Sequence, residues 1–199
     1  MVSRRSFLGA VATLAAAGSG VRSAHAAAQG ALSQFMVSAP ACTDKATLTP
    51  AAPDDAGFRP GAPRRQRLSE PGTAGAPLVV SGGVSGLTCG RIKGARVDFW
   101  QADAAGVIDR SGFRLRGHQL TAEDGSYSIT TVVPCASGGR APHLSARIEV
   151  PGKATLVTEL FLPDDPANAR DPRFKQALVM LPRASSTGRV LSFDFILDL

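Results

Sequence analysis

Hydrophobic and polar residues alternate with a period of two along most of the second half of the chain. The alternation covers residues 78–84, 95–100, 127–132, 144–150, 155–162 and 190–197. Such a period places every second side chain on one face, which is typical of strands that bury one side. Asp124-Gly125 and Pro151-Gly152 supply turn residues between neighbouring segments. Six or more short strands with such turns predict an all-β fold, an antiparallel β-sandwich.

The chain ahead of these strands has a different character. Residues 27–77 are rich in Ala, Pro and Gly and show no sustained period, so they are expected to form an extended N-terminal arm before the sandwich at 78–199. Residues 172–179, which follow Asp171, are the one helix-like stretch and predict a turn or two. With 14 Pro and 21 Gly in 199 residues, a helical bundle is excluded.

The first 26 residues have the organisation of a cleaved export signal. Arg4 and Arg5 precede an uncharged apolar stretch at 9–21, and Ala24-His25-Ala26 supplies a small-residue cleavage site. The paired arginines resemble a twin-arginine leader, with an ordinary secretory leader as the alternative. We therefore expect a periplasmic or secreted protein. No membrane span is expected after cleavage, because no other apolar run reaches about 18 residues.

Half of the net positive charge of the chain belongs to this leader. Lys and Arg number 22 against 16 Asp and Glu, a formal net charge of +6. The leader holds three arginines and no acid, so the remainder carries 19 minus 16, or +3. No run of Lys and Arg with interleaved aromatic residues is present, and no nucleic-acid partner is expected.

Three cysteines are present, and thiols outside the cytoplasm tend to pair. Cys42 precedes the sandwich and Cys89 precedes a strand, whereas Cys135 lies in a turn. We expect a disulfide between Cys42 and Cys89, with Cys135 as the odd thiol. Sequence alone does not fix the connectivity, so three reduced or buried thiols stay open as the alternative.

Five segments of the chain follow one another in an order that belongs to a known family. They are residues 94–106 (GARVDFWQADAAG), 113–125 (FRLRGHQLTAEDG), 134–150, 156–161 and 193–195. This order resembles the intradiol ring-cleavage dioxygenases, the family that cleaves catechol and protocatechuate. The resemblance covers residues 78–198 and implies the fold of that family, while function has to be argued from the site.

The resemblance also implies where the metal ligands of the family fall. Family enzymes hold a ferric ion with two tyrosines and two histidines. Here Ile108 takes the place of the first tyrosine, Ser137 that of the second, and Ser145 that of the second histidine, so His143 alone remains. Isoleucine has no donor atom, and a serine alcohol ionises far less readily than a phenol, whose pKa is about 10.

The rest of the chain cannot supply the missing ligands. Tyr127 is the only tyrosine, and of the three histidines His25 leaves with the leader, so that His118 and His143 remain. A ferric site with two tyrosinates cannot be assembled from this set. We therefore expect no cofactor, although the family uses ferric iron.

The residues left at the site allow more than one interpretation. Arg140 matches an active-site arginine of the family, which implies contact with an anionic ligand; an ion pair with a structural acid is the alternative. His143 is expected to be a hydrogen-bonded remnant of the metal site. Weaker alternatives, a new metal site or a serine nucleophile, draw on His118, His143, Cys135, Asp103, Asp109, Ser137 and Ser145, whose spacing fits neither motif.

Two classes of function follow from these observations. The first is a pseudoenzyme, an intradiol dioxygenase-like protein that serves as a binding or interaction module for a small aromatic or anionic ligand. The second is an active catechol-type ring dioxygenase, or another oxidoreductase, with an altered metal shell. A structural homo-oligomer joined through the N-terminal arm is left open as a third.

Overall fold

A computed structural model of the chain describes residues 47–52, 57–88, 90–186 and 188–199. All of them belong to one compact unit, residues 36–199. The predicted leader and the predicted Cys42–Cys89 disulfide lie outside the described residues. Within the described ranges, no helix is long and apolar enough to cross a membrane.

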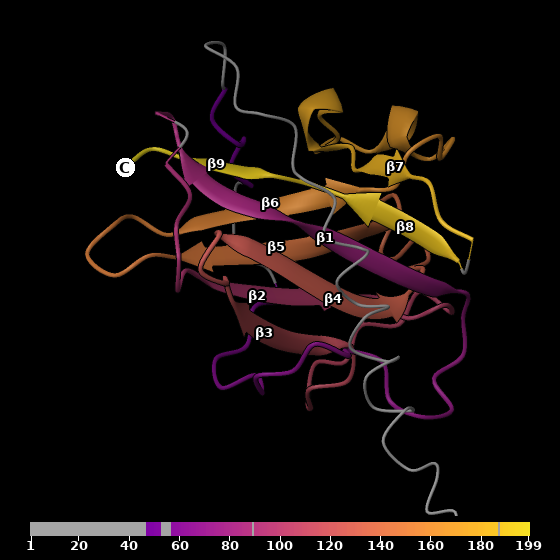
Figure 1. Ribbon diagram of the computed structural model, residues 1–199. Coiled ribbons are helices and arrows are strands. Elements are labelled where there is room, and N and C mark those ends of the chain that lie inside the picture. The colour runs from indigo at the N-terminus through magenta and orange to yellow at the C-terminus, as the bar shows by residue number, and fades with distance from the viewer. Residues whose placement is uncertain (1–46, 53–56, 89, 187) are drawn as a thin grey trace, which may run out of the picture. The chain divides into compact units, whose positions relative to one another are not determined.

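Two β-sheets stack face to face, as Figure 1 shows. The first sheet has the order β4 (Ser126–Val132), β1 (Pro77–Gly86), β8 (Arg189–Ser192) and β7 (Leu181–Arg183), and β9 (Phe195–Leu197) pairs with the far end of β1. The second sheet has the order β3 (Arg116–Leu120), β2 (Arg96–Gln101), β5 (His143–Glu149) and β6 (Leu156–Phe161). The predicted all-β sandwich is confirmed.

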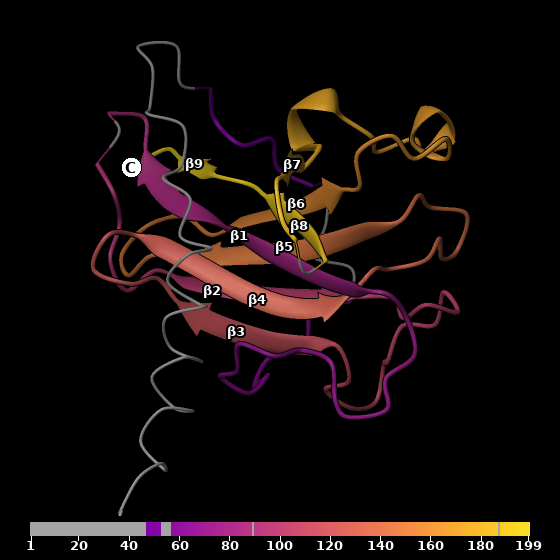
Figure 2. The same cartoon turned by 45° about the vertical axis from the view of Figure 1, so that its right-hand side comes forward.

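The core lies between the two sheets and is built by the alternation seen in the sequence. On β5, Leu144, Ala146 and Ile148 belong to the hydrophobic core cluster. Because neighbouring side chains on a strand point to opposite faces, Ser145 and Arg147 lie on the outer face of the second sheet. Figure 2 shows β1 and β4 crossing in front of the strands of this sheet. The site discussed below therefore lies on the side of β5 that the core does not use.

The prediction of one continuous strand at 190–197 is wrong, because the structure has two strands there, β8 and β9. Phe193 and Asp194 separate β8 from β9, and both are fixed by bonds to the first sheet. The Asp194 carboxylate accepts a hydrogen bond from the Gly83 amide at 2.7 Å, and the Phe193 carbonyl accepts one from the Tyr127 hydroxyl at 2.8 Å. Both β8 and β9 run parallel to β1, whereas antiparallel pairing was expected throughout.

Other connections differ in a similar way. β3 was not predicted, because its sequence Arg-Gly-His-Gln-Leu shows no apolar alternation. The turn at 123–126 is present but leads from β3 in one sheet to β4 in the other, so it does not close a hairpin. The turn at 150–153 does join the antiparallel neighbours β5 and β6.

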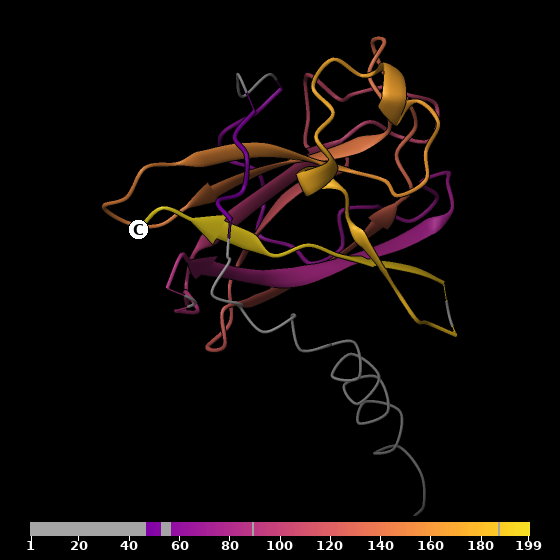
Figure 3. The ribbon, with the colours of Figure 1, turned by 90° about the horizontal axis from the view of Figure 1, so that it is seen from above.

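The helical turns within the described residues lie in the connection from β6 to β7. They are two short 3-10 turns, η1 (Asn168–Arg170) and η2 (Gln176–Leu178), so the helix-like stretch at 172–179 is reduced to one turn. Figure 3 shows this connection gathered at one end of the sandwich.

The described residues before β1 follow the sheets without forming a helix or strand of their own. Arg64 makes an isolated bridge with His118 of β3, and Arg67 makes one with Thr130 of β4. Residues 47–52 connect the two sheets through backbone hydrogen bonds. The Thr49 amide donates to the Ile196 carbonyl of β9 at 3.0 Å, and the Ala52 amide donates to the Val157 carbonyl of β6 at 2.8 Å.

The Tyr127 hydroxyl allows a direct test of the core. Its ring packs between Phe99 and Phe195, with centroids 5.4 and 5.5 Å away, and only 4% of the residue is exposed. Tyr127→Phe removes the donor to the buried Phe193 carbonyl, so the free energy of unfolding should fall by about 1–2 kcal/mol in urea denaturation. Ser128→Ala, which alters the opposite face of the same strand, should change it by less than about 0.5 kcal/mol. Equal values for the two variants would contradict this assignment.

Candidate functional site

The residues selected from the sequence come from three places around the start of β5. Ile108 lies in the connection from β2 to β3, and Ser137 and Arg140 lie in the connection from β4 to β5. His143 and Ser145 are the first and third residues of β5 itself. Since residues two apart on a strand share a face, the two side chains of β5 lie on the outer face of the second sheet.

Ser137 joins the two connections to each other. Its hydroxyl donates to the Gly106 carbonyl at 2.6 Å, and nearby the Cys135 amide donates to the Asp103 carbonyl at 3.1 Å. The backbones approach so closely that a Cβ atom at Gly106, where φ is +77°, would lie 2.4 Å from the Ala136 carbonyl oxygen. Only glycine fits there. The Ser137 proton is therefore used in holding the two connections together.

Ile108 is half-buried, two residues beyond Gly106 on the same connection. Its side chain consists of carbon alone, so it contributes shape to this part of the surface and no metal ligand.

His143 keeps one ring nitrogen available. Its Nδ1 lies 2.7 Å from the Ala141 carbonyl oxygen, which can only accept a hydrogen bond. In the neutral ring Nδ1 therefore carries the proton and Nε2 the lone pair, an arrangement common among metal-binding histidines. The ring packs against Phe161, with centroids 5.8 Å apart. His143 is thus oriented as a single ligand or hydrogen-bond acceptor.

Ser145 is buried, with 7% of its surface exposed, and lies between Trp100 on β2 and Glu159 on β6. His118 does not join it: this residue belongs to β3, two strands from β5, and its Nδ1 lies 2.8 Å from the Ala62 carbonyl. Among the described residues, no three His, Cys, Asp or Glu side chains are grouped as a metal ion would require.

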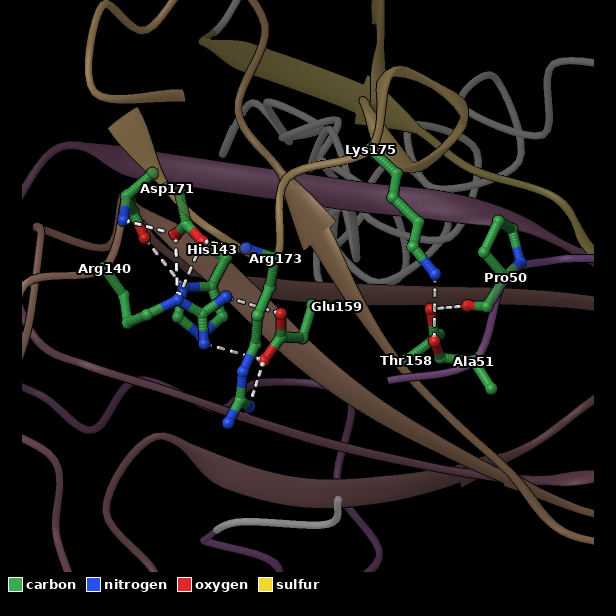
Figure 4. A network of polar contacts seen from close by, with 10 residues as sticks. Pro50, Ala51, Arg140, His143, Thr158, Glu159, Asp171, Arg173 and Lys175 are labelled. Carbon is green, nitrogen blue, oxygen red and sulfur yellow. Dashed lines mark hydrogen bonds and ion pairs between the residues drawn. The ribbon is translucent and has the colours of Figure 1, made fainter. Parts of the chain in front are cut away.

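The strongest polar feature of the site is an ion-pair network around Arg140 (Figure 4). Arg140 Nε donates to both carboxylate oxygens of Asp171 at 2.9 Å, and its Nη1 and Nη2 donate to Glu159 at 3.1 and 2.6 Å. Asp171 also accepts bonds from the backbone amides of Ala141 at 2.7 Å and Arg173 at 2.8 Å. The Arg173 side chain completes the network at 3.4 Å from Glu159. The anions that contact Arg140 here are therefore carboxylates of the protein itself.

Burial and hydrogen bonding shift the pKa values of Arg140 and Asp171 in opposite directions. Burial lowers the pKa of Arg140, but the bonds to Glu159 and Asp171 outweigh it and raise the pKa. Burial raises the pKa of Asp171, whose side chain is fully buried, but the Arg173 amide, the Arg140 side chain and the Ala141 amide together lower it. Arg140 and Asp171 therefore stay charged. With Arg173 and Glu159 they make a network of two cations and two anions.

The donors present do not fit a ferric ion held by phenolates. The one phenol of the chain, Tyr127, lies in the core, and burial raises its pKa well above the usual value. Ser137 is bonded to a backbone carbonyl, and Ser145 offers an alcohol. His143 is the only residue of the family-matched set that presents a ready ligand atom.

Comparison with known proteins places the chain in a family. Residues 57–199 match the dioxygenase family. A solved intradiol ring-cleavage dioxygenase from Tetranychus urticae has the same fold, with a TM-score of 0.67, 22% identity, and coverage of 77% of this chain and 95% of that one. The chain belongs to the intradiol dioxygenase family. The resemblance inferred from the motifs is thereby confirmed, and family members use iron.

Members of this family with greater identity include both a structure and enzymes. The dioxygenase domain of a dioxygenase carbohydrate-binding protein fusion from the cellulolytic bacterium Streptomyces sp. SirexAA-E is 41% identical, with a TM-score of 0.73 over 77% of this chain and 99% of that one. Hydroxyquinol 1,2-dioxygenase of Nocardioides simplex is 31% identical over 54% of this chain and 45% of its own length. The 6-chlorohydroxyquinol 1,2-dioxygenase of Cupriavidus pinatubonensis is 32% identical over 64% and 55%. The chain spans about half the length of these two enzymes.

Sequence reasoning missed the partners of Arg140. Glu159 interrupts the apolar strand Leu-Val-Thr-Glu-Leu-Phe, and a charged residue inside a buried strand signals that a cation lies opposite. Asp171 was noted only because it precedes a helix-like stretch. Asp171 and Glu159 lie 31 and 19 residues from Arg140, and no repeat of charged residues in the sequence identifies Arg140 as their common partner.

The lowered pKa of Asp171 predicts a specific pH dependence. A group whose pKa is lowered on folding stabilises the protein above its unfolded pKa, about 3.9 for Asp, and that contribution is lost as the pH falls through the folded value. Asp171→Asn should therefore be less stable than the unaltered protein at pH 7, by about 3 kcal/mol, because Arg140 loses a buried partner. The difference should shrink below about pH 4.

Urea denaturation across the pH range measures this difference. Asp164→Asn is the matched control, because Asp164 is an exposed acid of the same connection with φ at +59°, which Asn tolerates. This control should follow the unaltered protein at every pH. A stability gap for Asp171→Asn that is as wide in acid as at neutral pH would show that the charge is not responsible.

Proposed function

We propose that this protein is a non-catalytic member of the intradiol dioxygenase family, exported from the cytoplasm, that binds a small aromatic or anionic ligand. The observation that carries the proposal is the chemistry at the positions matching the ferric ligands. They hold an isoleucine, a serine bonded to a backbone carbonyl and a buried serine, beside one histidine. Twin-arginine export remains part of the proposal on the basis of the leader alone.

Ring cleavage by the family depends on a ferric ion, and Fe(III) favours hard anionic oxygen ligands. The unionised alcohols of Ser137 and Ser145 are poor substitutes for phenolates. Two acids beside His143 and Ser145, Glu159 and Asp171, are both bonded to Arg140, so binding a metal would require them to give up a buried cation. The altered positions therefore favour a protein that has kept the scaffold of the family without its iron chemistry.

An altered metal shell is the second candidate, and His143 is the observation that favours it. With its Nδ1 bonded to the Ala141 carbonyl, Nε2 is oriented as a ligand atom. One histidine alone binds a metal weakly, so this candidate requires water or substrate oxygens for the rest of the shell. Metal analysis separates it from the leading proposal.

The direct test is metal content, visible spectrum and oxygen uptake of the purified protein after growth in iron-supplied medium. We expect much less than one iron per chain, no visible absorption band and no uptake with catechol. The same is expected with hydroxyquinol, the substrate in the name of one relative. One iron per chain with a strong visible band, or ring cleavage of either compound, would overturn the proposal.

Restoring the ligands tests the assignment of the three positions. The triple variant Ile108→Tyr, Ser137→Tyr, Ser145→His supplies two phenols and an imidazole beside His143, so it should take up iron and become coloured. The control Ile108→Phe, Ser137→Phe, Ser145→His has nearly the same shape without phenolic oxygens, so it should stay colourless. A visible band in both variants, or in neither, contradicts the assignment.

A further inference from the structure

The Arg140 guanidinium is bonded to carboxylates of the protein at both of its hydrogen-bonding edges (Figure 4). Its Nη1 and Nη2 donate to the two carboxylate oxygens of Glu159 at 3.1 and 2.6 Å, as a parallel pair of bonds. Its Nε donates to both oxygens of Asp171 at 2.9 Å. A guanidinium recognises a carboxylate through two parallel N–H groups. An anion from outside can therefore bind Arg140 in this way only if one of the two acids leaves.

The two acids differ in what else they hold. The Asp171 side chain is fully buried, and it also accepts bonds from the Ala141 and Arg173 amides, so it fixes the backbone at two places. The Glu159 side chain is 9% exposed. Among the described residues, its carboxylate contacts the side chains of Arg140 and Arg173 and no backbone amide. Glu159 is therefore the acid whose bonds neutralise arginines without fixing the backbone.

Glu159 also belongs to the candidate site by its position on β6. It lies directly opposite Ser145 of β5, and residues paired in this way share a face of the sheet. Ser145 is one of the positions that match the ferric ligands of the family. Burial of a carboxylate is unfavourable unless a cation pairs with it. Glu159 therefore brings a negative charge to the face of the site, and Arg140 is a cation that pairs with it there.

We propose that Arg140 is an anion site that the protein fills with its own Glu159 carboxylate, so that anionic ligands are excluded and the ligand bound here is uncharged. The proposal rests on the proposed binding function and selects the uncharged members of its ligand class. An external carboxylate has to displace one that the fold holds in place, and an intramolecular group acts at a high effective concentration. An uncharged aromatic ligand does not compete for Arg140 and leaves both ion pairs intact.

Rescue of the variant Glu159→Ala by acetate tests the proposal. The substitution removes one methylene and the carboxylate, which together have the size of an acetate ion. Acetate should therefore bind to Arg140 in the space that is left. The midpoint of thermal unfolding of Glu159→Ala should rise by about 2 °C or more in about 100 mM sodium acetate, because a ligand that binds the folded state stabilises it. Sodium chloride or acetamide at the same concentration should give no such rise.

Two controls separate this effect from a general effect of acetate. The unaltered protein should show no rise, because Glu159 fills the site. Glu149→Ala should show none either. Glu149 also pairs with an arginine, at 2.6 Å from Arg147, but its side chain is 38% exposed, so its removal leaves open surface in place of an enclosed site.

Glu159→Gln covers the case in which the alanine variant does not fold. It keeps the size of the side chain and an acceptor for Arg140, but it removes the charge. Acetate then competes with a neutral amide. The NMR signal of the Arg140 Nε–H group should therefore shift at a lower acetate concentration in Glu159→Gln than in the unaltered protein.

Two results would overturn this inference. One is a rise with acetate in Glu159→Ala that is no larger than in the unaltered protein, and the other is an Arg140 signal that responds equally in Glu159→Gln and in the unaltered protein. Iron content and oxygen uptake are measured on the same preparations. Iron-dependent ring cleavage rejects the proposed function, whereas a preparation without iron or activity in which acetate has no specific effect rejects this inference alone.

Discussion

The bonds between the Arg140 guanidinium and the carboxylates of Asp171 and Glu159 hold together the part of the sandwich that carries the candidate site. They join three separate segments: the entry to β5, the strand β6 and the connection that carries η1 and η2. Each partner is largely buried, so none of the charges can be left without the others. Glu159 and Arg173 of this network also line a pocket of about 300 Å³ beside Ala51 and Leu178.

The core residues of β5 and its candidate site residues lie on opposite faces of the strand. Leu144, Ala146 and Ile148 pack into the core, while His143 and Ser145 lie on the outer face. Substitutions on the outer face leave the apolar contacts between the sheets untouched. This separation would let β5 keep its part of the family fold, which the chain matches across residues 57–199, while an outer-face position such as Ser145 changes.

Much of the sandwich could be predicted from the sequence, because buried strands leave a period of two. The strands β1, β2, β4, β5 and β6 all fall where that period predicts them. β3 could not be found this way, because its polar residues interact with the chain before β1. The site was only partly predictable. Arg140 was identified, but its acids lie 19 and 31 residues further along the chain, and pairing between single charges has no repeat that a sequence pattern can reveal.

The parallel pairing of β1 with β8 and β9 has a consequence for biosynthesis. β1 leaves the ribosome well before β8 and β9, two of its three described neighbours, which follow after more than a hundred further residues. The edge of β1 that pairs with β8 and β9 stays unpaired in the meantime. Contacts between residues so distant in sequence also form slowly. The first sheet therefore closes only after residues 189–197 have been made, and until then the unpaired edge of β1 is open to pairing with other chains.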